Sequence, residues 1–235
     1  YSDADSEGGI GFMIQQTLYN RLIMIREVKD VVTIITQVVV DADDPAFSRP
    51  TKPIGPYYRK EEIEALQRNN GWVMIRQTGG YRRVVPSPMP KRIVEKNVIQ
   101  RLALEGVVVI AAGGGGVPVV ETADGTLRGI DAVIDKDLTT SVLATEIGAE
   151  RIVILTDVDR VYRDFGTPRQ AGLDHVSLAE IKAFHAEGHF PPGSMGPKIM
   201  AAIRFLEAGG KRVIITLPEL MGKALEGRAG TTIVP

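Results

Sequence analysis

The sequence predicts a layered α/β fold with a mainly parallel sheet and a small protruding insertion. Apolar β-branched runs alternate with helical patterns along the chain, and alternation of this kind favours a parallel sheet covered by helices. The runs are apolar at nearly every position, as in strands that are buried on both faces. One stretch near the first third of the chain breaks this rhythm and predicts the insertion.

The candidate strands are short runs rich in valine and isoleucine. They lie at residues 31–40, 107–112, 117–120, 152–155, 213–216 and 231–234.

Five helical patterns lie between the candidate strands, at residues 10–25, 90–105, 138–147, 177–187 and 197–208. Pro90 and Pro197 stand in first turns, where proline is favoured, and glycines follow most of the predicted C-terminal ends. Ser177 and Glu180 have the spacing of a capping box.

The insertion spans residues 41–88 and is rich in proline, glycine, arginine and tyrosine. It has only one short helical pattern, at residues 60–69. Long connections of this composition in a compact domain are typically functional, so we expect a lid over the site. Residues 1–235 are expected to form a single domain with this lid subdomain inserted.

Composition excludes several classes of protein. The chain has 28 basic and 29 acidic residues, so no basic excess indicates a nucleic acid or an anionic membrane as partner. It has no cysteine, which excludes disulfides and thiolate metal sites, and its three histidines lack metal-ligand spacing. No apolar run approaches membrane-spanning length, and no signal peptide is visible. We expect a cytoplasmic protein without a protein-bound metal.

A run of four glycines, residues 113–116 (the glycine loop), follows a candidate strand directly. Its backbone allows close approach by a ligand. Three interpretations are open: a tight structural turn, a backbone surface for a small anion or phosphate, or a dinucleotide-binding loop. The third requires a following helix, whereas a strand-like run follows here.

Two lysines stand at predicted helix starts, where the helix dipole disfavours a cation. Lys198 follows Gly193 and Ser194 and enters one helix, and Lys136 precedes Asp137 at another. A bound anion would relieve this cost, and phosphoryl transfer needs positive charge held in place. The alternatives are an exposed lysine at an ordinary helix entry and an N-cap role for Asp137.

Two further candidates involve the end of a strand and the insertion. Thr156 and Asp157 follow the strand at 152–155, at the edge where open parallel sheets bind ligands, and Tyr162 lies within reach of a nucleotide. A polar turn is the alternative. Lys52 stands between Pro50 and Pro53, which stiffen the backbone around it.

Taken together, these segments resemble the carbamate kinases, members of the amino-acid kinase family. Asp-Pro-Ala-Phe at 44–47 and Pro-Thr-Lys-Pro-Ile-Gly-Pro at 50–56 are specific to carbamate kinases within that family. The other matching segments are residues 11–16, 31–37, 82–88, 113–118, 132–137, 155–158 and 193–198.

The resemblance implies a three-layer αβα sandwich, a homodimer and a protruding subdomain over the active site. It implies reversible phosphoryl transfer from ATP to carbamate, giving ADP and carbamoyl phosphate, with Mg²⁺, in arginine metabolism. Lys136 and Lys198 would stabilise the transferring phosphoryl group, and Asp137 would orient them. Lys52, Gly113 and Gly114 would bind the substrate. The nucleotide pocket would be lined by Thr156, Asp157, Tyr162, Gly193, Ser194 and Met195.

The resemblance does not include the N-terminal part of the family pattern. Carbamate kinases open with a strand and a Gly-Gly-Asn loop, and a His-Gly-Asn-Gly-Pro loop follows later; neither occurs here. Tyr1 is not an initiator methionine, and residues 1–9 have the composition of a loop. We therefore expect that an N-terminal portion is missing and that the natural protein contains both loops. A sheet without its first strands would expose an apolar edge.

Three other functions remain open. Another amino-acid kinase, such as an acetylglutamate kinase, would share the general sites but not the proline-flanked lysine motif. A non-catalytic nucleotide-binding protein would fit the absence of the N-terminal loops. A dinucleotide oxidoreductase rests on the glycine run alone.

Overall fold

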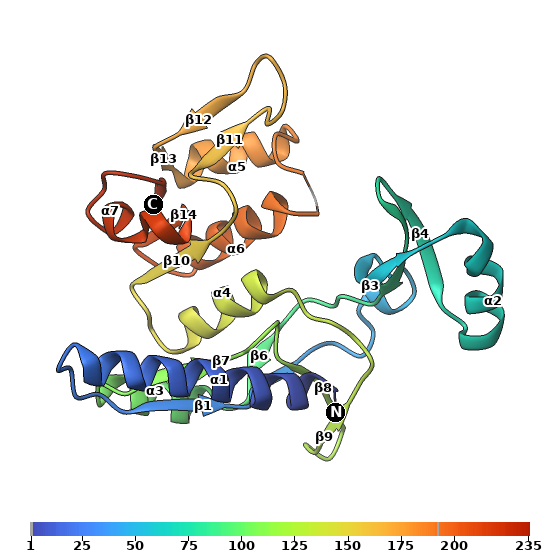
Figure 1. Cartoon of the computed structure of the whole chain (residues 1–235), viewed down its shortest axis with the longest axis horizontal. Helices are drawn as coiled ribbons and strands as arrows, with labels where there is room; N and C mark the ends of the chain where they lie inside the picture. The colour runs from blue at the N-terminus through green and yellow to red at the C-terminus, as the bar shows by residue number, and fades with distance from the viewer. Residues whose placement is uncertain (1, 192) are drawn as a thin grey trace.

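The computed structural model describes residues 2–191 and 193–235, and parallel strand pairs run through it (Figure 1). Four pairs are parallel: β1 with β7, β2 with β8, β10 with β14, and β13 with β15. Their bounds are β1 (Val31–Ile34), β2 (Gln37–Val39), β7 (Val108–Ala111), β8 (Val117–Glu121), β10 (Arg151–Leu155), β13 (His175–Ser177), β14 (Arg212–Thr216) and β15 (Thr231–Val234).

Short antiparallel strands extend this framework. β6 (Arg92–Ile93) pairs with β2, and β9 (Leu127–Gly129) pairs with β8. β11 (Val161–Arg163) and β12 (Ala171–Leu173) form a separate two-stranded ribbon. β14 and β15 also pair in antiparallel fashion.

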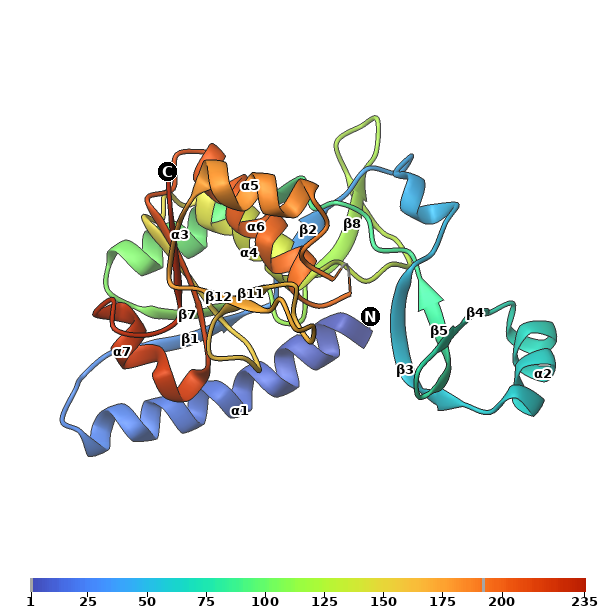
Figure 2. The ribbon, with the colours of Figure 1, turned by 90° about the horizontal axis from the view of Figure 1, so that it is seen from above.

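Helices cover the strands on two sides, as Figure 2 shows. One side has α3 (Lys96–Leu104), α4 (Lys136–Glu146), α5 (Leu178–Ala186) and α6 (Met195–Glu207). The other has the long α1 (Ser2–Met24) and the short α7 (Met221–Leu225), which follows the 3₁₀ turn η2 (Pro218–Leu220). The predicted layered α/β architecture is confirmed.

Two apolar cores lie within these layers. One surrounds α6 and the strands β10 and β14, and includes the fully buried Phe205, Val213 and Ile215. The other lies between β2, β6 and α4, and includes Val38 and Ile93. The continuous apolar runs of the sequence therefore bury side chains on both faces of their strands, as expected.

The insertion forms its own three-stranded antiparallel sheet, ordered β3–β5–β4, with α2 beside it. It projects from the layers in both views (Figures 1 and 2). Its elements are the 3₁₀ turn η1 (Pro45–Phe47), β3 (Lys52–Tyr58), α2 (Lys60–Asn70), β4 (Val73–Gln77) and β5 (Gly80–Val85). The sequence predicted the helix but not these strands, in which partly exposed and polar residues interrupt the apolar pattern.

The two ends of the insertion lie next to each other. Val39 of β2 faces Arg92 of β6 in the antiparallel register. The backbone N–H of Met89 donates to the side chain of Asp44 at 2.9 Å, and this carboxylate also caps η1. The projecting unit, which we call the lid, is therefore attached at a narrow base.

Two predicted elements were wrong in extent. The strand at 31–40 is two strands, because the chain leaves β1 at Ile35 and changes sheet partner from β7 to β8. The helix at 90–105 begins only at Lys96, because residues 92–93 pair with β2 and bury Ile93. Pro90 therefore does not open a helix.

The N-terminal segment was also predicted wrongly as a loop. Tyr1 lies outside the described residues, but Ser2 to Gly9 are the first turns of α1. Acidic residues stand in its first turn, where the helix dipole favours them. A Cβ at Gly11 would overlap the side chain of Thr33, so this glycine allows α1 to pack closely on β1.

Candidate functional site

The N-terminus of α4 is the centre of the candidate site. Asp135 is the N-cap residue, and its Oδ1 atom accepts the backbone N–H of Asp137 at 2.9 Å. Both carboxylates are buried, with 8% of each residue exposed. The sequence interpretation considered Asp137 as the cap and started the helix at Leu138. That was wrong by two residues, because the cap is the preceding aspartate of the same motif.

Lys198 forms a buried ion pair with Asp137. Its Nζ atom lies 2.8 Å from Asp137 Oδ2, and 10% of each side chain is exposed. The lysine comes from the first turn of α6, which packs against α4 and begins at Met195, two residues before the predicted start at Pro197. The structure thus brings together two predicted catalytic residues that are 61 positions apart.

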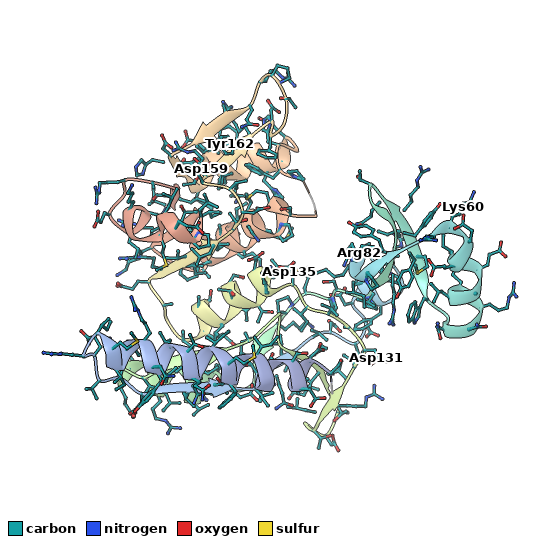
Figure 3. The ribbon with its side chains drawn as sticks, in the orientation of Figure 1. Lys60, Arg82, Asp131, Asp135, Asp159 and Tyr162 are labelled. Carbon is teal, nitrogen blue, oxygen red and sulfur yellow. The ribbon has the colours of Figure 1, made fainter. Side chains whose placement is uncertain are left out.

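Lys52 reaches the same helix start from the lid. Its Nζ atom lies 2.6 Å from Asp135 Oδ2. Burial by itself raises the pKa of Asp135, but the Lys52 ammonium group and the two N–H groups at the start of α4 outweigh it, so the pKa lies below its ordinary value. Figure 3 shows Asp135 at the end of α4 that faces the lid.

Lys136 is placed differently from the other two lysines. It is the first residue of α4 and is exposed to solvent. Among the residues that the structure describes, no carboxylate pairs with its ammonium group. The expectation that Asp137 orients both lysines is therefore met for Lys198 only, because the Asp137 carboxylate is directed toward α6.

The glycine loop follows β7 in a backbone conformation that needs small residues. Ala112 and Gly113 have φ of +63° and +41°, in the left-handed region. At Gly115, with φ of +147°, a Cβ would overlap the carbonyl oxygen of Ile134. The Thr139 hydroxyl donates to the Gly115 carbonyl at 2.7 Å and ties the loop to α4.

Gly113 and Gly114 are exposed and line a cavity of about 460 Å³. The cavity also contacts Val133 and Ile134, which lead into α4, so the loop and the charged helix start border the same region. A strand, β8, follows the loop, and the strand–loop–helix unit that a dinucleotide site requires is not formed there.

A second cavity of about 220 Å³ lies at the C-terminal edge of β10. Four of the six predicted nucleotide-binding residues line it: Asp157, Tyr162, Ser194 and Met195. Thr156 and Gly193 lie next to these in the chain but do not line the cavity. Val158, Phe165 and Pro191 complete the lining and were not predicted.

Tyr162 is held in place by a hydrogen bond. Its hydroxyl donates to Asp159 Oδ1 at 2.6 Å, and its ring lies 5.9 Å from that of Phe165 (Figure 3). This bond raises the pKa of the tyrosine and lowers that of Asp159, because it favours the neutral phenol and the ionised carboxylate. The cavity therefore has an apolar aromatic wall with fixed orientation, which suits a flat base.

The sequence interpretation missed the role of Asp135. It belongs to the Asp-Lys-Asp motif that the interpretation selected, but a role was given only to its second aspartate. The signal was its position just before a helical pattern, which is where an N-cap stands. Its partner Lys52 is 83 positions away and could not be inferred from local sequence.

Metal and membrane features can be stated for residues 2–191 and 193–235 only. In that part of the chain, no cluster of three or more His, Asp or Glu side chains is arranged to hold a metal ion. None of its helices has both the length and the apolar character that a membrane span needs.

Comparison with known proteins shows which family has this fold and sequence. The model of the amino acid kinase family matches residues 58–217. The carbamate kinase-like protein YahI of Escherichia coli is 53% identical over 233 residues, covering 98% of this chain and 73% of the relative. A carbamate kinase of Pyrococcus furiosus is 51% identical over 233 residues, covering 99% of this chain and 74% of the relative.

A solved structure agrees with the sequence relatives. The structure of carbamate kinase from Giardia lamblia bound to AMP-PNP superposes with a TM-score of 0.89 at 42% identity. The match covers 98% of this chain and 73% of that one, so the chain spans about three quarters of its relatives' length. By its fold and by its sequence, the chain belongs to the amino acid kinase family.

Proposed function

We propose that the protein is a carbamate kinase, which transfers a phosphoryl group reversibly between ATP and carbamate. The observation that supports this most is the convergence of Lys52, Asp135, Asp137 and Lys198 at the start of α4. The relatives named carbamate kinase match almost the whole chain at about 50% identity, including the lid.

The charges at the start of α4 suit phosphoryl transfer. A carbamate oxygen would attack the γ-phosphorus of ATP, the bond to the β-phosphate oxygen would break, and ADP would leave with that electron pair. Negative charge builds on the transferring group and the leaving oxygen, and fixed cations stabilise it. Lys198 and Lys136 would supply this charge, and Asp137 would hold Lys198 at its position.

Lys52 would act from the lid at the acceptor end. Its present partner is Asp135, and an anionic acceptor or phosphate is a competing partner for the same ammonium group. Gly113 and Gly114 would offer backbone groups to the acceptor. The 220 Å³ cavity would take the adenosine, with Tyr162 beside the base or ribose and Ser194 and Met195 near the phosphates.

Mg²⁺ would enter with the nucleotide as MgATP. Mg²⁺ keeps several waters and is commonly bound through substrate phosphates with few protein ligands. The described residues fit this, since they offer no cluster of three carboxylates.

A substrate panel with detection of ADP formation tests the reaction. We expect turnover of carbamate and none of acetylglutamate in the protein at its natural length. The reverse result would favour an acetylglutamate kinase. MgATP binding with no turnover of any acceptor would favour a non-catalytic nucleotide-binding protein.

We also propose a cytoplasmic homodimer that serves arginine metabolism. Support for the dimer comes from α1, which leaves large apolar side chains exposed outside the cavity at the glycine loop: Phe12, Met13, Ile23 and Met24. Exposed apolar patches of this kind mark interaction surfaces. Light scattering tests the proposal: the mass of two chains is expected, and a monomer at micromolar concentration would contradict it.

A further inference from the structure

Glu7 is a buried acidic residue that the proposed reaction does not use. It lies in the second turn of α1, and only 7% of it is exposed. Its Oε2 atom accepts the backbone N–H of Thr36 at 2.7 Å, but its Oε1 atom is buried without a hydrogen-bond partner among the described residues. A buried polar atom without a partner costs free energy, and the cost is greater when the group is charged.

Glu7 supports the glycine loop by two routes. Its Cγ atom packs against Gly113, since a Cβ added to that glycine would lie only 2.5 Å from the Cγ of Glu7. Through Thr36 it also acts on the start of the loop, because the Thr36 hydroxyl accepts the backbone N–H of Ala112 at 2.8 Å. Ala112 has a left-handed backbone, so this hydrogen bond holds a strained conformation.

The charges around Glu7 are all of one sign. Asp3 and Glu95 both act on it as like charges, Asp3 from one turn earlier in α1 and Glu95 from the N-cap of α3. β1, β7 and the glycine loop contain no charged residue. Burial raises the pKa of Glu7 above its ordinary 4.5; the Thr36 N–H lowers it by less than this, and the two acidic neighbours raise it further.

The cavity beside Glu7 has to accept a negative charge if the proposed function is right. Glu7 and Asp3 line it together with the glycine loop. An ionised Glu7 would repel a carbamate or phosphate group in a medium of low dielectric constant. A neutral Glu7 keeps the contacts with Thr36 and Gly113 and removes this repulsion.

We propose that Glu7 is a positioning residue of the glycine loop, that it acts as a neutral carboxylic acid, and that its ionisation weakens binding of the anionic acceptor. This inference rests on the proposed function of the site. It predicts that the KM for carbamoyl phosphate rises with pH as Glu7 loses its proton, by roughly tenfold, whereas kcat changes little.

Kinetics of ATP formation from carbamoyl phosphate and MgADP test the proposal across pH. Glu7→Gln keeps an acceptor for the Thr36 N–H and stays neutral, so its KM should equal the low-pH value of wild type at every pH. Glu7→Ala loses the support and should raise KM at every pH. Asp5→Asn, an exposed carboxylate of the same helix, should leave the wild-type pH profile unchanged.

Thermal unfolding gives a second readout that does not depend on activity. Because folding raises the pKa of Glu7, its proton stabilises the folded state at low pH, and this stability is lost as pH rises through the folded-state pKa. The Tm of Glu7→Gln relative to wild type should therefore increase with pH.

Three results would overturn the proposal: a KM in Glu7→Gln as high as in Glu7→Ala, a wild-type pH profile that persists in Glu7→Gln, or a Tm difference that is constant with pH. Absence of ATP formation by the wild type would contradict the proposed function instead, and the Tm comparison would still decide the state of Glu7.

Discussion

Lys198 and Asp137 form an ion pair that is buried although it lies at a candidate catalytic centre. Removing one partner of a buried pair leaves an unpaired charge, which typically costs about 3–5 kcal/mol. The lysine must therefore be tested for stability and turnover together. An exposed pair of the same kind, Lys182 with Glu207 between α5 and α6, provides a comparison.

Lys198→Ala should lower kcat by about 10²–10³-fold, because it removes a cation that would stabilise the transferring phosphoryl group. Turnover per folded molecule is the quantity to measure, with folding checked by circular dichroism. Lys182→Ala should leave both turnover and stability nearly unchanged, because exposed pairs contribute little. Near-normal kcat in Lys198→Ala would show that this lysine is not catalytic.

Substitutions at two positions of the glycine loop test its conformation and its binding role separately. A Cβ at Gly115 would overlap Ile134, whereas a Cβ at Gly114 meets nothing within 4 Å. Gly115→Ala should therefore destabilise the fold, by about 1–3 kcal/mol in chemical denaturation. Gly114→Ala should keep wild-type stability and raise the KM for carbamoyl phosphate. An unchanged KM in a stable Gly114→Ala variant would count against a substrate role for the loop.

Elements set by local sequence were predicted well. The capping box of Ser177 and Glu180 forms as expected, because its atoms lie three residues apart. The break between β1 and β2 was not predicted, because the apolar run continues across it and the change of partner from β7 to β8 involves strands far away in the sequence. The strands of the lid were missed for a related reason, since they are only half-buried and lack a continuous apolar pattern.

The sequence predicted those parts of the candidate site in which a lysine or a run of glycines stands at the end of a helix or strand. Lys198, Lys136 and the glycine loop were selected on this basis. The partners of these residues were not predictable from spacing, because each pairing joins distant parts of the chain. The nucleotide cavity shows the same limit: its residues after β10 were expected, but its aromatic wall at Phe165 was not.

At the scale of the whole molecule, Lys52 links the lid to the body of the protein. Its ion pair with Asp135 joins the two parts across the candidate site. The lid is attached at a narrow base, and this ion pair connects it to the body of the protein at the candidate site. Under the proposed function, an anionic substrate would compete with Asp135 for the Lys52 ammonium group.

Lys52→Ala should reduce kcat/KM for carbamoyl phosphate by about 10- to 100-fold, the effect of losing one charge-assisted hydrogen bond. The KM for MgADP should change little, because the residues that line the nucleotide cavity all lie outside the lid. Lys60→Ala, an exposed lysine on α2 of the same lid, is the matched control. An effect confined to the KM for MgADP would contradict the assigned role.

The most direct test of carbamate kinase activity is ATP formation from carbamoyl phosphate and MgADP by the protein at its natural length. We predict robust turnover that depends on both substrates and is lost in Lys198→Ala. Absence of ATP formation, with MgADP still bound in a thermal-shift or calorimetric measurement, would contradict the proposed reaction and favour a non-catalytic nucleotide-binding protein.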